Sequence, residues 1–176
     1  MTQIRNLSLS PFNDLGVLLG GSWMTEVKLR SALIRLGDSN PDVNRGAIRE
    51  LEKLGVDLPK VLLAHYRKSG AWRARVSCVF FAVPYARTSD DAVQLGIEAL
   101  KDKSRIVRYR ACSLLAYSFR DNALPYLRAL LNHSDSSTVE DACAGIDCIE
   151  HKNHHWFMDR GHTGRLEWAV DEEYEK

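Results

Sequence analysis

Features that mark membrane, secreted and disulfide-rich proteins are missing from this sequence. Its longest apolar stretches, residues 16–19 and 78–84, are far shorter than the about 20 residues that a membrane-spanning helix needs. No apolar run of signal-peptide length follows Met1, so we expect a cytoplasmic protein with no membrane contact. The four cysteines form no Cys-x-x-Cys pair, and each lies in an apolar stretch. This pattern predicts buried, reduced thiols at Cys78, Cys112, Cys143 and Cys148.

Motifs of the common enzyme classes are missing as well. The sequence has no His-Glu-x-x-His, no Gly-x-Ser-x-Gly, no phosphate-binding loop and no Gly-x-Gly-x-x-Gly. It also has no His-Glu dipeptide, the pair with which helical-repeat hydroxylases hold iron. We therefore expect a protein that is not an enzyme and needs no cofactor.

Charge is present in both signs but is unevenly distributed. The net charge of +1 excludes a uniformly basic coat for nucleic acid. Residues 60–130 carry 13 basic and 5 acidic side chains, whereas residues 131–176 carry 4 basic and 11 acidic ones. A basic middle and an acidic end can attract each other or can face different partners.

Apolar residues recur at helical spacing through most of the chain, and strand signals are almost absent before residue 155. One set of apolar stripes predicts first helices, and a second set between them predicts partner helices. The first set begins at Val43, Trp72, Val107 and Val139, and the second at Leu58, Val93 and Leu124. Helix pairs with a period in the thirties indicate an α-solenoid.

The first helices resemble those of the HEAT-like (armadillo-type) repeat family. Val107-Arg108 followed by Ala111 fits the pattern, and Trp72-Arg73 matches it, but Asn44 stands where an arginine is expected. The resemblance covers about residues 40–150. It implies a right-handed stack of helix pairs whose second helices line a concave face. It also implies that Arg73 and Arg108 pair with acids or carbonyl groups of the neighbouring repeat.

The segments before and after the repeats are predicted to cap the two ends of a single domain. Residues 1–41 form the expected N-terminal capping region, with a helix from Ser22 to about Leu36 that buries Val27, Leu29, Leu33 and Leu36. The repeats occupy residues 42–150. Two short aromatic runs at 156–158 and 166–170 flank a glycine turn. This pattern predicts a short C-terminal β-hairpin within residues 151–176, in which Trp156 pairs with Trp168.

Four histidines near the C-terminus lie within twelve residues. A metal site is one interpretation of this cluster, with Asp159 among the histidines. Polar residues in and around the hairpin are the other, because the spacing matches no known ligand pattern. The residues concerned are His151, His154, His155 and His162.

Binding of another protein is the function that the repeats favour. The expected contact residues are exposed positions of the second helices: His65, Arg67, Lys68, Gln94, Glu98, Lys101, Arg128 and Asn132. Small helical-repeat proteins occur among bacterial immunity proteins, and this analogy suggests a cognate toxin as the partner.

Nucleic-acid binding is the alternative function. HEAT-like proteins of the alkylpurine DNA glycosylase type bind DNA in a basic groove, and a basic stripe within residues 60–130 could follow a phosphate backbone in the same way. The stripe comprises Arg67, Lys68, Arg73 and Arg75 at one corner and Lys101, Lys103, Arg105, Arg108 and Arg110 at the next.

Overall fold

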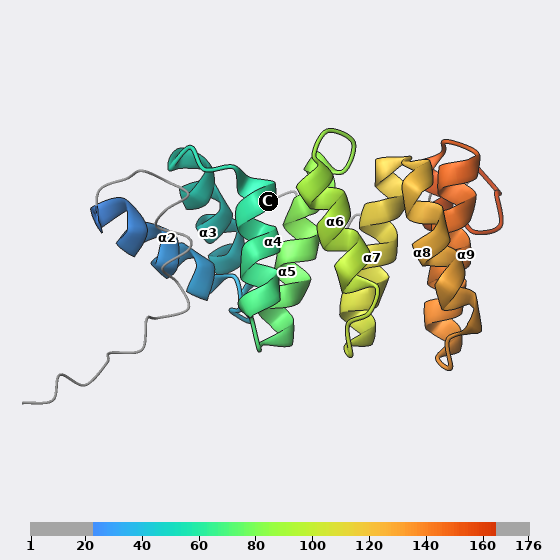
Figure 1. Cartoon of the computed structure of the whole chain (residues 1–176), viewed down its shortest axis with the longest axis horizontal. Coiled ribbons are helices and arrows are strands. Elements are labelled where there is room, and N and C mark those ends of the chain that lie inside the picture. Colours follow the sequence, from blue (N-terminus) through green and yellow to red (C-terminus); the bar gives the residue numbers. More distant parts are fainter. Residues whose placement is uncertain (1–22, 165–176) are drawn as a thin grey trace, which may run out of the picture.

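The computed structural model describes residues 23–164, and every regular element in that range is helical. Figure 1 shows the helices standing side by side along the long axis in chain order. The α-helices are α2 (Trp23–Arg35), α3 (Pro41–Lys53), α4 (Leu58–Lys68), α5 (Trp72–Ala82), α6 (Asp90–Ala99), α7 (Arg105–Ser118), α8 (Leu124–Ala129) and α9 (Ser136–Glu150). Short 3₁₀-helices are η1 (Val83–Tyr85), η2 (Asp121–Ala123), η3 (Leu130–Asn132) and η4 (His154–Phe157). The predicted all-helical class is confirmed for these residues, and the arrangement is compatible with an α-solenoid.

Capping residues explain where several helices begin. The side chains of Asn40, Asp57 and Ser89 each accept a hydrogen bond from a backbone N–H group in the first turn of α3, α4 and α6. Pro41 and Pro59 lie at the start of α3 and α4, where the missing N–H group costs little. The polar turns between the apolar stripes therefore place the helix starts.

Two rows of helices share one hydrophobic core. Helices α5, α7 and α9 pack against one another in sequence, and α4 packs against α6. The rows contact each other through α4 with α5, α6 with α7 and α8 with α9. The core is rich in leucine, and its fully buried members include Leu62, Leu95, Leu114, Leu127 and Ile149. This two-row packing is what helix pairs with one apolar stripe per helix require.

The described part of the N-terminal region agrees with most of its prediction. Helix α2 covers nearly the predicted range, and Leu29, Leu33 and Leu36 are buried. Val27, which was expected to be buried, is 50% exposed because it lies on the opposite side of α2. Ser22, the expected cap, lies outside the described residues.

The predicted C-terminal β-hairpin is wrong where the structure can test it. Trp156 and Phe157 lie in η4, whose first turn is capped by the Asn153 side chain. Phe157 is buried, and its ring centroid lies 5.6 Å from that of Tyr109 on α7. The helical turn directs the Phe157 ring into the core, whereas in a strand successive side chains would point to opposite faces. The second predicted strand and Trp168 lie outside the described residues.

Three of the four cysteines are buried, as expected, but Cys143 is exposed. Burial raises the pKa of the Cys148 thiol to about 12 and the pKa values of Cys78 and Cys112 above their usual range. Cys143 lies on the outer side of α9, so its prediction as a buried thiol was wrong.

Candidate partner-binding site

Three of the predicted contact residues form a cluster between two neighbouring second helices. Arg67 on α4 donates from Nε and Nη2 to the two carboxylate oxygens of Glu98 on α6, at 2.9 and 2.5 Å. Gln94, one turn earlier on α6, donates to the same carboxylate at 2.9 Å. The hydrogen bond from Arg67 is the main reason that the pKa of Glu98 lies below its usual value. The cluster thus links α4 and α6 through one charged carboxylate.

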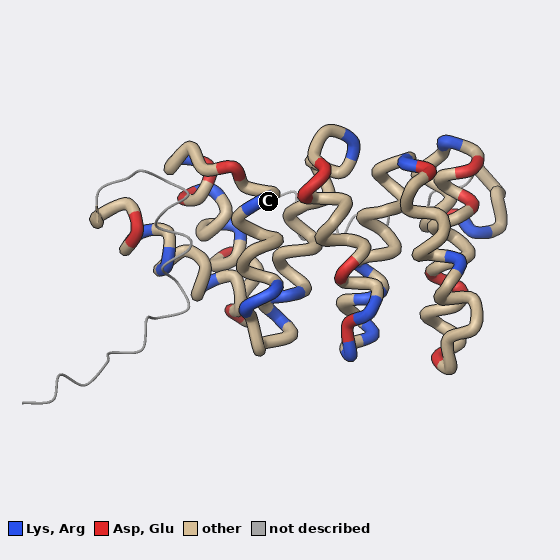
Figure 2. Tube along the Cα trace, viewed as in Figure 1, with Lys and Arg blue, Asp and Glu red and all other residues tan. Residues whose placement is uncertain are grey.

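Further cations surround this cluster at the same edge of the molecule. Lys101 is exposed at the end of α6, and its charge also lowers the pKa of Glu98. Lys68 is exposed at the end of α4. A hollow of about 390 Å³ lies beside them, lined by Arg67, Lys101 and Lys103 among others. Figure 2 shows lysine and arginine positions gathered at the lower ends of α4 and α7.

The remaining predicted contact residues lie apart from the cluster. His65 is half-buried on α4, and its Nε2 atom has no hydrogen-bond partner among the described residues. Burial lowers the pKa of His65, which favours the neutral imidazole. Arg128 on α8 pairs with Glu150 on α9 at 2.7 Å, and Asn132 is exposed in η3. Arg128 and Asn132 therefore extend the surface to the next second helix, while His65 contributes less of its side chain than expected.

The expected arginine ladder is present, but one of its members differs. Arg75, not Arg73, reaches the neighbouring repeat, where its Nε and Nη2 atoms donate to Asp102 at 2.6 and 3.1 Å. Arg75 Nη1 also donates to the carbonyl oxygens of Ser69 and Gly70 in the loop before its own helix. Arg73 instead lies over the exposed ring of Trp72, 4.8 Å from its centroid. The misassignment arose because Trp72 was taken as a core residue.

Arg108 repeats the same arrangement one unit later, as predicted. It donates to Asp135 and Thr138 of the following unit, at 2.8 and 3.0 Å, and from Nη1 to two carbonyl oxygens of the preceding loop. Asn44 occupies the same place in α3, and its shorter side chain donates only to the preceding loop, at the carbonyl oxygen of Asp38.

These contacts interrupt the predicted basic stripe. Arg75 and Arg108 are buried and bound to carboxylates, and Arg67 is held by Glu98. Exposed cations remain at Lys68, Arg73, Lys101, Lys103 and Arg105. A phosphate backbone gains affinity from each cation that it meets, so a stripe with three members neutralised offers fewer contacts than the sequence suggested.

The histidines near the C-terminus contact one another and one carboxylate. His151 and His162 lie 2.9 and 2.5 Å from the two carboxylate oxygens of Asp147, and Trp156 stacks on His162 with ring centroids 3.8 Å apart. The ring centroid of His154 lies 4.6 Å from that of Tyr117 and 4.1 Å from that of His155. Asp159 accepts hydrogen bonds from the N–H groups of Thr163 and Gly164, which closes a turn. Within residues 23–164, no group of histidine, cysteine or acidic side chains is arranged to hold a metal ion.

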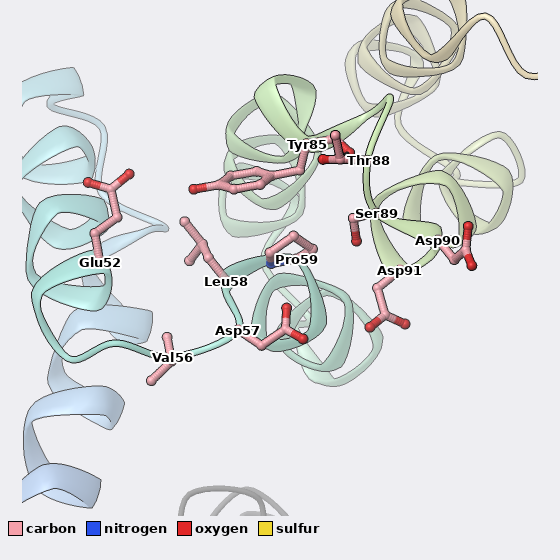
Figure 3. Close-up of a pocket in the computed structure, with 10 residues that line it drawn as sticks. All are labelled: Glu52, Val56, Asp57, Leu58, Pro59, Tyr85, Thr88, Ser89, Asp90 and Asp91. Atoms are coloured by element: carbon pink, nitrogen blue, oxygen red, sulfur yellow. Dashed lines mark hydrogen bonds between the residues drawn. The ribbon is translucent and has the colours of Figure 1, made fainter.

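An acidic hollow at the opposite edge was missed by sequence reasoning. Figure 3 shows Glu52, Asp57 and Asp91 facing a space of about 810 Å³, with Tyr85 at its side. These residues come from separate turns and helices, so no local sequence motif indicates the hollow. Asp57 caps α4, and Asp90, at the edge of the hollow, pairs with Arg120. Cations at the ends of α4 and α6 and carboxylates at their starts thus lie at opposite ends of these two helices.

The sequence matches no family model, and no curated protein is significantly similar to it. Across the described part of the chain, no helix is long and apolar enough to cross a membrane.

Proposed function

We propose that this protein is a HEAT-like helical-repeat module that binds another protein through the face formed by its second helices. The observation that carries this proposal is the cluster of Arg67, Gln94 and Glu98. It joins two repeats, so its donors and acceptors are held in place before a partner arrives. Preorganised side chains lose less conformational entropy on binding.

The recurring arginine contacts support the HEAT-like part of the proposal. Arg75 and Arg108 are each the fourth residue of a first helix, and each binds an aspartate 27 residues further along the chain. Each also donates to carbonyl oxygens five and six residues earlier. Repetition of the same contacts at the same separations favours an α-solenoid of equivalent units.

A bacterial immunity protein is the specific role that we propose for this module. Such a protein would bind a cognate toxin in the cytoplasm and occlude its active site. The separation of basic and acidic edges supports this role, because complementary charge accelerates the encounter of two proteins.

Nucleic-acid binding is the second candidate, and the exposed side chains of Lys101, Lys103 and Arg105 favour it. The carboxylates that hold Arg67, Arg75 and Arg108 weigh against it. Affinity for DNA or RNA that falls steeply with salt would distinguish it from protein binding.

The test is affinity capture from lysate of the source cell, followed by titration of the purified partner. A variant with Lys68→Glu, Lys101→Glu and Arg128→Glu reverses three charges of the second-helix face. Lys60→Glu is the matched control, because Lys60 is exposed at the other end of α4. We expect the wild type to capture one protein in stoichiometric amount. The triple variant should no longer capture this protein, and the Lys60→Glu control should still capture it. Capture of nucleic acid alone would reject the proposal.

A further inference from the structure

Two neighbouring first helices carry positive charge without any negative charge. Neither α5 nor α7 contains an aspartate or a glutamate, and together they contain five arginines. Arg75 and Arg108 are buried in the ladder between repeats. Arg73, Arg105 and Arg110 remain, and none of the three forms an ion pair with a described residue.

Aromatic rings hold two of these arginines in place. The Arg110 guanidinium lies 5.0 Å from the ring centroid of Phe80 on α5 and 5.4 Å from that of Tyr109 on α7. Arg73 lies over Trp72 at 4.8 Å. A guanidinium stacked on a ring keeps its N–H groups at the edge, where a carboxylate can accept two of them.

The same surface exposes large apolar side chains. Trp72, Phe80 and Ile106 are between 41% and 45% exposed. Trp72 and Ile106 also line a hollow of about 260 Å³ with Lys103, between the starts of α5 and α7. Aromatic residues and arginine are enriched at the centres of protein interfaces, where they supply most of the binding energy.

We infer that the face defined by Trp72, Arg73, Phe80, Ile106 and Arg110, here the arginine–aromatic face, binds an acidic segment of another protein that carries apolar residues beside its carboxylates. Arg73, Arg105 and Arg110 supply the charge complementarity, and the apolar side chains require an apolar partner. This surface lies on the first helices and adjoins the second-helix face at Lys103, which lines a hollow on each.

Single-stranded nucleic acid fits this surface less well. Bases bind such proteins by stacking on open aromatic faces. Here Arg73 and Arg110 each already lie over a ring, of Trp72 and of Phe80. A base would have to displace a guanidinium from the ring, whereas a carboxylate meets the guanidinium where it lies.

The test measures fluorescence polarisation of a labelled synthetic peptide that alternates glutamate with leucine and phenylalanine, added to the full chain. We expect saturable binding that Arg73→Gln with Arg110→Gln weakens about tenfold, since two charge contacts of about 0.7 kcal/mol each amount to that factor. We expect a similar loss for Phe80→Ala. Arg49→Gln with Lys53→Gln on the exposed side of α3 is the matched control and should bind as the wild type does.

Four results would overturn the inference. The peptide with glutamine in place of glutamate could bind equally well, or the Arg73 and Arg110 variant could bind unchanged. An oligodeoxynucleotide could bind more tightly than the peptide and depend on the same arginines, which would assign the face to nucleic acid. Glu172→Gln with Glu173→Gln could strengthen peptide binding, which would make the chain's own acidic C-terminal segment the occupant.

The outcome is separable from that of the proposed function. A variant with Lys68→Gln, Lys101→Gln and Arg128→Gln should retain peptide binding, because none of its changes replaces a residue of the arginine–aromatic face. Loss of the peptide in that variant would place the peptide on the second-helix face and would likewise overturn the inference.

Discussion

Replacing Asp102 by alanine should destabilise the protein more than any substitution of an exposed charge. Asp102 is buried and accepts hydrogen bonds from Arg75 at 2.6 and 3.1 Å, from the Tyr66 hydroxyl at 3.1 Å and from the Ser104 N–H group at 2.8 Å. Asp102→Ala leaves the buried guanidinium of Arg75 without its carboxylate. Breaking a buried ion pair in this way costs about 3 to 5 kcal/mol.

Removing both charges should restore much of that loss. A double variant, Arg75→Met with Asp102→Leu, eliminates the unpaired charge and replaces it with apolar contacts, so we expect it to be clearly more stable than Asp102→Ala alone. The assay is equilibrium denaturation followed by far-ultraviolet circular dichroism, with the free energy of unfolding as the readout. Arg67→Ala, which breaks the exposed pair with Glu98, is the reference for a surface contact and should cost about 1 kcal/mol or less.

The pH dependence supplies a second readout for the same residue. Burial alone would raise the pKa of Asp102, but the hydrogen bonds from Arg75, Ser104 and Tyr66 outweigh it and hold this pKa below the usual value. A folded-state pKa below the unfolded-state value of about 3.9 means that the charged carboxylate stabilises the fold above that pH. This contribution is lost as the pH falls through the lower folded-state pKa.

The difference in unfolding free energy between the wild type and Asp102→Asn should therefore shrink as the medium is acidified below about pH 4. The reasoning would be refuted if Asp102→Ala cost no more than Arg67→Ala at neutral pH. It would also fail if the difference between wild type and Asp102→Asn grew on acidification.

Three further predictions concern packing, thiols and the second-helix face. Gly96→Ala should destabilise the fold by about 1 to 3 kcal/mol, because the new Cβ atom would lie 2.8 Å from the Leu115 side chain. Gly46→Ala, with open space around the new Cβ atom, should stabilise the fold by about 0.4 to 1 kcal/mol. Thermal melts of both variants test these two predictions. A thiol-reactive disulfide reagent should modify one cysteine, Cys143, in the native protein and all four after unfolding. Arg67→Ala should weaken binding of the captured partner measurably while leaving the melting temperature within a few degrees of wild type, as a loss of about 1 kcal/mol or less implies.

Periodicity in the sequence was sufficient for the fold class because each helix buries one apolar stripe. The first-helix starts predicted at Trp72 and Val107 lie at or within two residues of the observed starts of α5 and α7. The arginine ladder shows the limit of this reasoning. Placing Arg75 rather than Arg73 in the ladder required knowing that Trp72 faces outward, and an apolar residue in a helical register gives no sign of which side of the helix is covered.

Contacts between distant segments could not be predicted from local patterns. Arg67 and Glu98 were both expected on the partner-binding face, but nothing in the spacing indicated that they bind each other across 31 residues. The C-terminal hairpin failed for a related reason. Aromatic runs around a glycine turn favour strands locally, yet burial of Phe157 against Tyr109 stabilises a helical turn there.

A photo-reactive amino acid in place of Gln94 tests the central claim most directly. Gln94 is exposed on α6 beside Arg67 and Glu98, so a partner on the second-helix face must pass close to it. Irradiation of source cells that express this variant should join it to one protein in high yield, while the same amino acid in place of Lys53 on α3 should not. Adducts to nucleic acid at position 94, or the same protein joined more strongly at position 53, would contradict binding of a protein partner at the second helices.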